Sequence, residues 1–201
     1  RSANVSVLLG NGDGSFQPPV QFAAGAGPAA VAVGDLQKKG KLDLVVANYD
    51  AGTISVLRGD GAGNFGTNTD YSTGGNQPYI LTLADINGDG FLDVVVPNSG
   101  SGNVAVMLNL GDGTFAAPVT YATGYRPFQV VAKDFNQDGR MDFAAVCYGN
   151  AYVNMYLGND TEYLAEDPVG SGIRTSASRG RLTTSSDVDY WSFTGKAGDW
   201  L

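Results

Sequence analysis

The sequence predicts an all-β fold, a partial β-propeller with about three four-stranded blades and a remnant of another. The chain has 201 residues, of which 29 are glycine, 8 are proline and 43% are hydrophobic. This composition supports a buried core with many tight turns, which favours short strands over long helices. The sequence also repeats itself about every 50 residues, a period typical of propeller blades.

The repeat consists of two segments that keep step with each other. The first reads VSVLLGNGDGSF, and the second starts at a proline and reaches an aspartate seven residues later. Copies of the first segment begin at Val5, Ile54, Val104 and, in degenerate form, Val153. Copies of the second begin at Pro28, Pro78 and Pro127. Two segments recurring together indicate one structural unit per repeat.

Each unit contains four predicted strands: one after the proline, one after an aspartate-rich loop, and one on each side of a glycine-rich turn. The strand after the aspartate-rich loop is continuously apolar (VVAN, VVVPN and FAAVC), which indicates that both faces of the sheet are covered. The turns GNGDG and GDGAG supply the positive-φ residues that hairpins need. The residues expected in the core are Val31, Val33, Leu44, Val46, Leu81, Leu83, Val94, Val96, Val130 and Ala144.

Composition also excludes several classes of function. The net charge of −8 disfavours nucleic acid and anionic membrane surfaces as partners. The chain has no histidine, which removes the commonest general base and zinc ligand, so we expect no enzymatic activity in this segment. Its single cysteine, Cys147, cannot form an internal disulfide, and no apolar run is long enough to span a membrane. Because the chain begins at Arg1 without a start methionine, we expect it to be part of a longer protein.

The aspartate-rich loops carry the one spacing that indicates chemistry, DxNxDGxxD, which occurs twice. Oxygen ligands at positions 1, 3 and 5, a backbone carbonyl at position 7 and a closing aspartate at position 9 favour Ca²⁺. The predicted ligands of the first such site are Asp85, Asn87, Asp89, Phe91 through its carbonyl, and Asp93. Those of the second are Asp134, Asn136, Asp138, Arg140 through its carbonyl, and Asp142. The alternative is that these residues only make good turns.

These loops are not helical calcium-binding motifs, because position 12 is occupied by Val96 and Ala145 instead of an acidic residue. The corresponding loop of the first unit, from Asp35 to Asp43, has Lys39 at the position of the third oxygen ligand. We expect its ammonium to pair with both aspartates and to replace the ion. The sequence therefore predicts two calcium ions and an inactive first loop.

With this loop the sequence resembles the FG-GAP and VCBS repeat family, which includes the propellers of integrin α-chains and blades of many bacterial surface proteins. The resemblance covers residues 1–165. It implies a seven-bladed propeller in a complete protein, calcium in the blade loops, a secreted or cell-surface location in a bacterium, and a role in adhesion or extracellular recognition.

The period stops after Pro168, and a second module is expected beyond it. Residues 166–181 have the composition of a linker. Residues 182–201 resemble the start of a bacterial pre-peptidase C-terminal domain, which implies a small β-sandwich; a generic pair of aromatic strands is the alternative.

The loops at the opposite end of the blades are free to carry a ligand site, because the fold makes few demands on them. Their aromatic and amide side chains suit an extracellular protein or a carbohydrate. The candidate ligand-binding residues are Tyr49, Asn76, Gln77, Tyr125, Arg126 and Tyr148. The tripeptide Arg58, Gly59 and Asp60 matches an integrin-binding motif, but it occupies a glycine-turn position of the repeat, which is sufficient to explain it.

Three functions remain open from the sequence. The first is a calcium-binding propeller for adhesion or extracellular recognition. The second is an accessory domain of a secreted carbohydrate-active enzyme or peptidase. The third is a structural spacer without a ligand.

Overall fold

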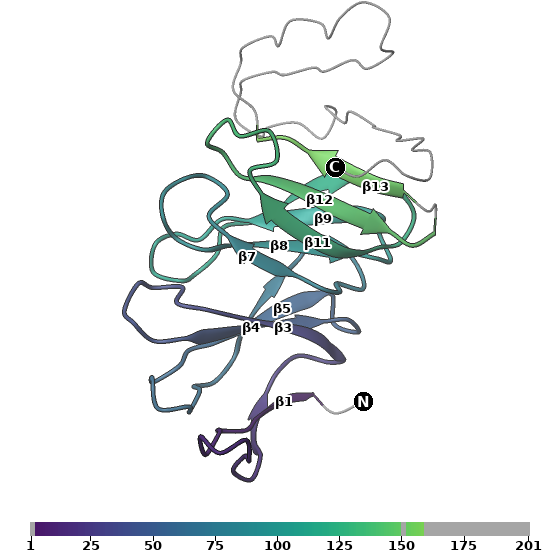
Figure 1. Cartoon of the computed structure of the whole chain (residues 1–201). Coiled ribbons are helices and arrows are strands. Elements are labelled where there is room, and N and C mark those ends of the chain that lie inside the picture. The colour runs from purple at the N-terminus through teal and green to yellow at the C-terminus, as the bar shows by residue number, and fades with distance from the viewer. Residues whose placement is uncertain (1–2, 150–151, 159–201) are drawn as a thin grey trace, which may run out of the picture.

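The computed structural model describes residues 3–149 and 152–158, and every regular element in this part of the chain is a β-strand. The strands form four antiparallel sheets, which follow one another along the chain (Figure 1). The all-β prediction is therefore confirmed. The expected boundary at residue 165, the linker and the C-terminal module lie outside the described residues. No helix in the described part is long and apolar enough to cross a membrane.

The N-terminal hairpin pairs β1 (Asn4–Val7) with β2 (Val20–Ala23). The first blade consists of β3 (Pro28–Gly34), β4 (Asp43–Asn48), β5 (Thr53–Leu57) and β6 (Thr69–Ser72). The second blade consists of β7 (Thr82–Ala84), β8 (Asp93–Asn98), β9 (Asn103–Met107) and β10 (Val119–Ala122). The third blade consists of β11 (Pro127–Lys133), β12 (Asp142–Cys147) and β13 (Tyr152–Tyr156). In each blade the strands neighbour one another in sequence order, as the repeat predicts.

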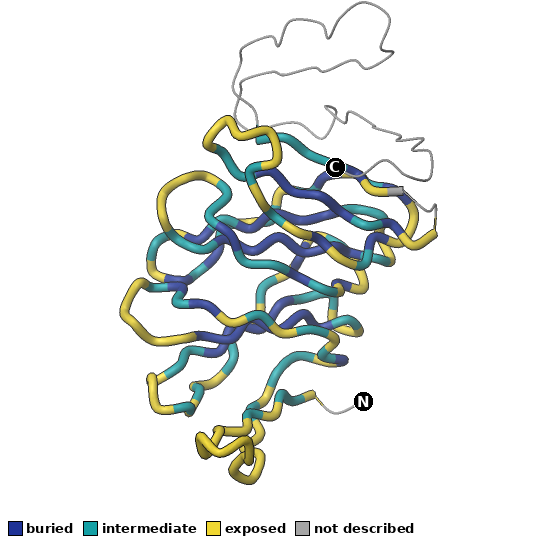
Figure 2. Tube along the Cα trace, in the orientation of Figure 1, coloured by how far each residue is buried: buried dark blue, intermediate teal, exposed yellow. Residues whose placement is uncertain are grey.

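The second strand of the first and second blades lies between two hydrophobic cores, which explains its continuously apolar sequence. All six residues of β4 and of β8 are buried. In β8, Val94 and Val96 pack into the core between the first and second blades, whereas Val95 packs into the core between the second and third. Figure 2 shows the buried central strands, with exposed residues concentrated in the loops. The prediction that both faces of these strands are covered is confirmed.

Two residues of the predicted core are exposed, so the prediction for them is wrong. Val31 and Val33 of β3 keep 50% and 55% of their surface accessible. They lie on the face that the N-terminal hairpin should cover, but the hairpin packs on Leu44 and Val46 of β4 and has only two strands. The alanines on the opposite face of β3 pack into the core between the first two blades. Of the other predicted core residues, Leu83 is half-buried and the rest are buried.

The connections divide into two sets at opposite ends of the blades. At one end lie the aspartate loops (residues 35–42, 85–92 and 134–141) and the glycine turns (58–68 and 108–118). The two kinds of connection are in contact there: the side chain of Gln37 donates a hydrogen bond to the carbonyl of Asp112. We call the other set, residues 24–27, 49–52, 73–77, 99–102, 123–126 and 148–149, the rim loops. Hydrogen bonds such as Tyr49 N–H to the Gly27 carbonyl join them to one another.

Candidate functional site

The aspartate loop of the second blade is built around Asp85. Its carboxylate accepts hydrogen bonds from the backbone N–H groups of Gly88 at 2.9 Å and Gly90 at 2.7 Å. The amide of Asn87 donates to the carboxylate of Asp89 at 2.8 Å. Gly90 has a φ of 85°, the left-handed conformation that turns the chain sharply at this point. The residues at positions 1, 3 and 5 of the motif therefore belong to one tight turn, as predicted.

The closing aspartate of this loop, Asp93, is buried at the start of β8. Its two carboxylate oxygens accept hydrogen bonds from the N–H groups of Ile86 and Asn109, both at 2.8 Å. Burial raises the pKa of Asp93 above its ordinary value. The two N–H groups lower this pKa, whereas the charges of Asp89 and Asp85 raise it further. The carboxylates of Asp85 and Asp89 therefore act on Asp93 as nearby negative charges.

The aspartate loop of the third blade has the same construction. The N–H groups of Asp138 and Gly139 donate to the carboxylate of Asp134 at 3.1 and 2.8 Å, and the amide of Asn136 donates to Asp138 at 3.0 Å. The closing residue, Asp142, is buried, and burial together with the charge of Asp138 raises its pKa. Both predicted calcium loops thus form a tight turn around their first aspartate and place the charge of the position-5 aspartate near a buried closing aspartate.

Each of these loops has one basic side chain beside its position-5 aspartate. The ammonium of Lys38, from the first blade, lies 4.2 Å from the ring centroid of Phe91 and helps to lower the pKa of Asp89. Arg140 approaches the carboxylate of Asp138 at 3.7 Å. Among the described residues, no three acidic, cysteine or histidine side chains have already converged in an arrangement that could hold a metal ion. The loops supply oxygen donors of the kind and number that Ca²⁺ prefers, without a preformed cluster.

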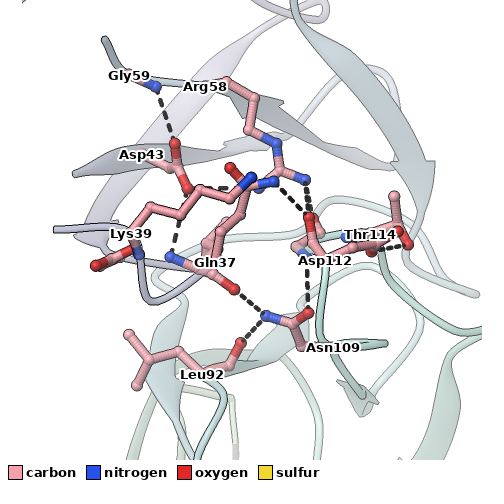
Figure 3. Close-up of polar contacts among 12 residues, drawn as sticks. Gln37, Lys39, Asp43, Arg58, Gly59, Leu92, Asn109, Asp112 and Thr114 are labelled. Atoms are coloured by element: carbon pink, nitrogen blue, oxygen red, sulfur yellow. Dashed lines mark hydrogen bonds and ion pairs between the residues drawn. The ribbon is translucent and has the colours of Figure 1, made fainter. Parts of the chain in front are cut away.

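The first aspartate loop has a different cation from the one that the sequence predicted. Arg58, which follows β5, approaches the buried carboxylate of Asp43 at 3.4 Å, and the N–H of Gly59 donates to the same group at 2.9 Å (Figure 3). Lys39 contributes its backbone N–H to Asp35, but within the described residues its ammonium forms no ion pair. The predicted pairing of Lys39 with both aspartates is therefore wrong. The cation beside Asp43 is Arg58, which directly follows β5.

Arg58 also joins the first blade to the second. Its guanidinium donates hydrogen bonds to the backbone carbonyls of Gly113 and Asp112 in the next glycine turn (Figure 3). Asn109 completes this junction by donating to the carbonyls of Leu36 at 2.9 Å and Leu92 at 3.1 Å. The arginine of the Arg58-Gly59-Asp60 tripeptide is thus engaged inside the molecule, which favours the interpretation of this tripeptide as a turn.

The rim loops repeat one backbone arrangement with different side chains. In the third blade, the N–H groups of Tyr148 and Gly149 donate to the carbonyls of Arg126 and Tyr125, both at 3.0 Å. The equivalent pairs are Ser99 with Gln77 and Gly100 with Asn76 in the second blade, and Tyr49 with Gly27 and Asp50 with Ala26 in the first. The backbone bonds are constant whereas the side chains change, which is the arrangement expected of a recognition surface on a rigid scaffold.

The residue before the proline of each repeat has a left-handed backbone. Its φ is 68° at Gly27, 57° at Gln77 and 56° at Arg126. A non-glycine residue in this conformation costs about 1 kcal/mol or more. Glycine satisfies the same turn without that cost in the first blade, so the turn itself does not require the side chains of Gln77 and Arg126. The sequence shows that the residue at this position differs between repeats, but it does not show the left-handed backbone.

The predicted ligand-binding residues fall into three groups. Tyr125, Arg126 and Tyr148 lie together in the third blade, where Arg126 is 5.3 Å from the ring centroid of Tyr125. Tyr49 instead contacts Tyr79 of the second blade, with ring centroids 5.9 Å apart. The remaining pair lies between these groups in the second blade: the N–H of Asn76 donates to Ser101 at 2.8 Å, and Gln77 lies beside Gly100.

Sequence analysis missed two aromatic residues of the rim, Tyr79 and Phe128. Both directly follow the proline of their repeats, a position occupied by Ala29 in the first blade. Phe128 contacts Tyr148 edge to face at 6.3 Å, and its carbonyl accepts a hydrogen bond from Ile80 that links the second and third blades. Comparison of the three repeats at this position could have revealed both residues, because the first repeat has alanine there and the other two have a large aromatic residue.

The repeated four-stranded antiparallel sheets, packed face to face, define the class of the protein as a β-propeller-like repeat domain. The family described as FG-GAP-like repeat matches residues 35–96 and 85–145. The chain therefore belongs to the FG-GAP-like repeat family. Comparison with the curated proteins finds no match.

Two solved structures are similar to this chain. One is an Agrocybe aegerita lectin, described as specifically recognising non-reducing terminal N-acetylglucosamine, with 26% sequence identity and a TM-score of 0.53 over 77% of this chain and 44% of the lectin. This chain thus spans less than half the length of the lectin. The other is the Photorhabdus luminescens Tc holotoxin pore, with 19% identity and a TM-score of 0.45 over 76% of this chain and 8% of that one. The family and the lectin support a β-propeller-like recognition domain.

Proposed function

We propose that this chain is a carbohydrate-recognition segment of a secreted or cell-surface β-propeller, with no catalytic activity of its own. The observation that carries this proposal is the rim: three repeats hold their loops with the same backbone hydrogen bonds while presenting different side chains. Exposed tyrosines on a rigid scaffold offer flat apolar surfaces and hydroxyl groups at low entropic cost. The similarity to a lectin favours a saccharide over a protein as the ligand.

Calcium is the second part of the proposal. Asp85, Asn87, Asp89, the carbonyl of Phe91 and Asp93 would hold one ion, and the equivalent residues of the third blade would hold another. The support comes from the donor set and from the raised pKa of Asp93, which is caused first by burial and then by the charges of Asp89 and Asp85. A bound ion would supply positive charge that offsets this repulsion and stiffens the loops. The proposal does not extend to the first loop, because Arg58 already lies beside Asp43.

A glycan array tests the recognition proposal directly. The chain should bind a subset of immobilised glycans, with those ending in N-acetylglucosamine as the first candidates. Tyr125→Ala, Arg126→Ala and Tyr148→Ala should each weaken binding, because these residues are exposed in the same part of the rim. Leu110→Ala is the matched control, since Leu110 is 65% exposed but lies in a glycine turn at the opposite end of the blade.

Two results would contradict the proposal. If no glycan binds the folded chain, recognition of carbohydrate is wrong and the spacer hypothesis gains support. If a glycan binds but none of the three rim substitutions affects it, the ligand site is elsewhere. An accessory role in a carbohydrate-active enzyme is compatible with glycan binding and requires a catalytic domain in the same full-length protein.

A further inference from the structure

The rim loops of the third blade contain a basic group that forms no hydrogen bond or ion pair within the described part of the chain. Arg126 is exposed, and within the described residues its guanidinium takes part in no ion pair and no hydrogen bond. The guanidinium lies 5.3 Å from the ring centroid of Tyr125. Arg58, in contrast, uses its guanidinium for Asp43 and for two carbonyls. Arg126 therefore presents its donors to the solvent in a chain whose net charge is −8.

Two exposed tyrosines lie on the same pair of rim loops as Arg126. Tyr125 is 60% exposed and Tyr148 is 76% exposed. The backbone hydrogen bonds between residues 125–126 and 148–149 keep the two rings on adjacent loops. Gly149 is required there, because a Cβ at this position would collide with the ring of Tyr125. Phe128 contacts the ring of Tyr148 edge to face, with ring centroids 6.3 Å apart.

The other two blades lack this combination at the same backbone positions. The place of Tyr125 is taken by Ala26 and Asn76, and the place of Arg126 by Gly27 and Gln77. Arg126 also has a left-handed backbone, a conformation that costs free energy for arginine but not for the equivalent Gly27 of the first blade. The third blade is thus the one described blade whose rim loops combine an exposed guanidinium with two exposed tyrosines.

We infer that the rim of the third blade binds a saccharide that carries a carboxylate, such as a terminal uronic acid. The planar guanidinium of Arg126 can donate two parallel hydrogen bonds to a carboxylate, and the rings of Tyr125 and Tyr148 provide surfaces for the C–H face of a sugar ring. This inference rests on the proposed carbohydrate recognition and specifies the chemistry of the ligand at one blade.

Calorimetry with a matched pair of oligosaccharides tests the inference. The two members differ only in their terminal residue, which is glucuronic acid in one and glucose in the other. The acidic member should bind about tenfold more tightly, the difference expected of charge-assisted hydrogen bonds. This preference should shrink as the salt concentration rises, because the site is exposed to solvent.

Arg126→Gln is the informative variant, because Gln77 occupies the same left-handed position in the second blade and the substitution should therefore fold. It should abolish the preference while leaving weak binding of the neutral member. Arg126→Lys should retain part of the preference, since lysine keeps the charge but not the planar fork. Lys41→Gln is the control: it removes one positive charge from an exposed residue of an aspartate loop and should leave the preference intact.

The outcomes separate the inference from the proposed function. Equal binding of the two oligosaccharides, or a preference that survives Arg126→Gln, overturns the inference and leaves carbohydrate recognition standing. Failure of both to bind, together with failure of every neutral glycan on the array, contradicts the proposed function itself. Arg126-dependent binding of a polyglutamate peptide without binding of the acidic oligosaccharide would overturn the inference in favour of a protein ligand.

Discussion

A single buried amide oxygen distinguishes the first blade from the second at the residue scale. Oδ1 of Asn48 is buried and has no hydrogen-bond partner, whereas Oδ1 of its equivalent, Asn98, accepts a hydrogen bond from the hydroxyl of Thr73 at 2.7 Å. Ala24 occupies the place of Thr73, since the N–H group of each donates to a carbonyl 21 residues earlier, Ala3 and Gly52 respectively. An unsatisfied buried acceptor destabilises the fold.

We expect Ala24→Thr to raise the free energy of unfolding by about 1 kcal/mol, because the new hydroxyl can donate to Asn48. Urea denaturation measures the change. Ala24→Val is the control, since it adds similar volume without a donor. A valine variant that is as stable as the threonine variant would show that packing, and not the hydrogen bond, is responsible.

The pairing of Arg58 with Asp43 gives a second prediction at this scale. Arg58→Leu introduces the residue found at the same repeat position in the second blade, Leu108, and leaves a buried carboxylate without its cation. The free energy of unfolding should fall by about 1 to 3 kcal/mol, since one partner is buried and the other is half-exposed.

Chemical denaturation checks this value, with Lys39→Leu as the control. The control should change stability by less than about 0.5 kcal/mol, because Lys39 is an exposed residue. If the Lys39 substitution were the more destabilising of the two, the cation beside Asp43 would have been misassigned.

At the scale of elements, the calcium proposal separates the blades. The loops before β8 and β12 carry the full donor set, whereas the loop before β4 has an arginine beside its closing aspartate. Chelation with EGTA should therefore accelerate amide hydrogen exchange in β8 and β12 and leave β4 protected. Exchange measured by mass spectrometry with and without calcium gives the comparison. Uniform loss of protection in all three strands would contradict separate sites.

The sequence was sufficient to predict these elements, because each is specified by local spacing. The 50-residue period predicted the sheets, and the uninterrupted apolar runs predicted that β4 and β8 are covered on both faces. The DxNxDGxxD motif predicted the tight turns at Asp85 and Asp134.

What the sequence could not predict depends on contacts between segments that are distant along the chain. Arg58 lies 15 residues after Asp43 in the sequence, at a repeat position where the other blades have leucine. Nothing in the sequence therefore indicated that these two residues pair. Val31 and Val33 have the periodicity of a buried strand, and only the extent of the neighbouring hairpin leaves them exposed. The left-handed φ of Arg126 likewise cannot be read from its residue type.

For the whole molecule, the exposed face of β3 predicts self-association. Val31 and Val33 lie on the same side of this strand and are at least half-exposed. Neighbouring exposed valines at a sheet surface favour association with other apolar surfaces. Sedimentation should show that the average mass of the 201-residue chain increases with concentration.

Replacement of both valines by threonine should reduce this association, because threonine keeps the β-branched shape but adds a hydroxyl group. Val45→Thr would be an unsuitable control, since Val45 is fully buried. Val20→Thr is better matched, because Val20 is also exposed but lies on the N-terminal hairpin. A monodisperse monomer of the unmodified chain at all concentrations would contradict the prediction.

The stoichiometry of calcium binding tests the account most directly, because it follows from the repeat, the donor sets and the role of Arg58 together. Calorimetric titration of the unmodified chain should find two ions, and Asp89→Asn and Asp138→Asn should each weaken or remove one of them. The double variant Lys39→Asp and Arg58→Leu should gain a third, whereas Lys39→Asp alone should not, because Arg58 still lies beside Asp43. Three equivalent ions in the unmodified chain, or none, would contradict the account.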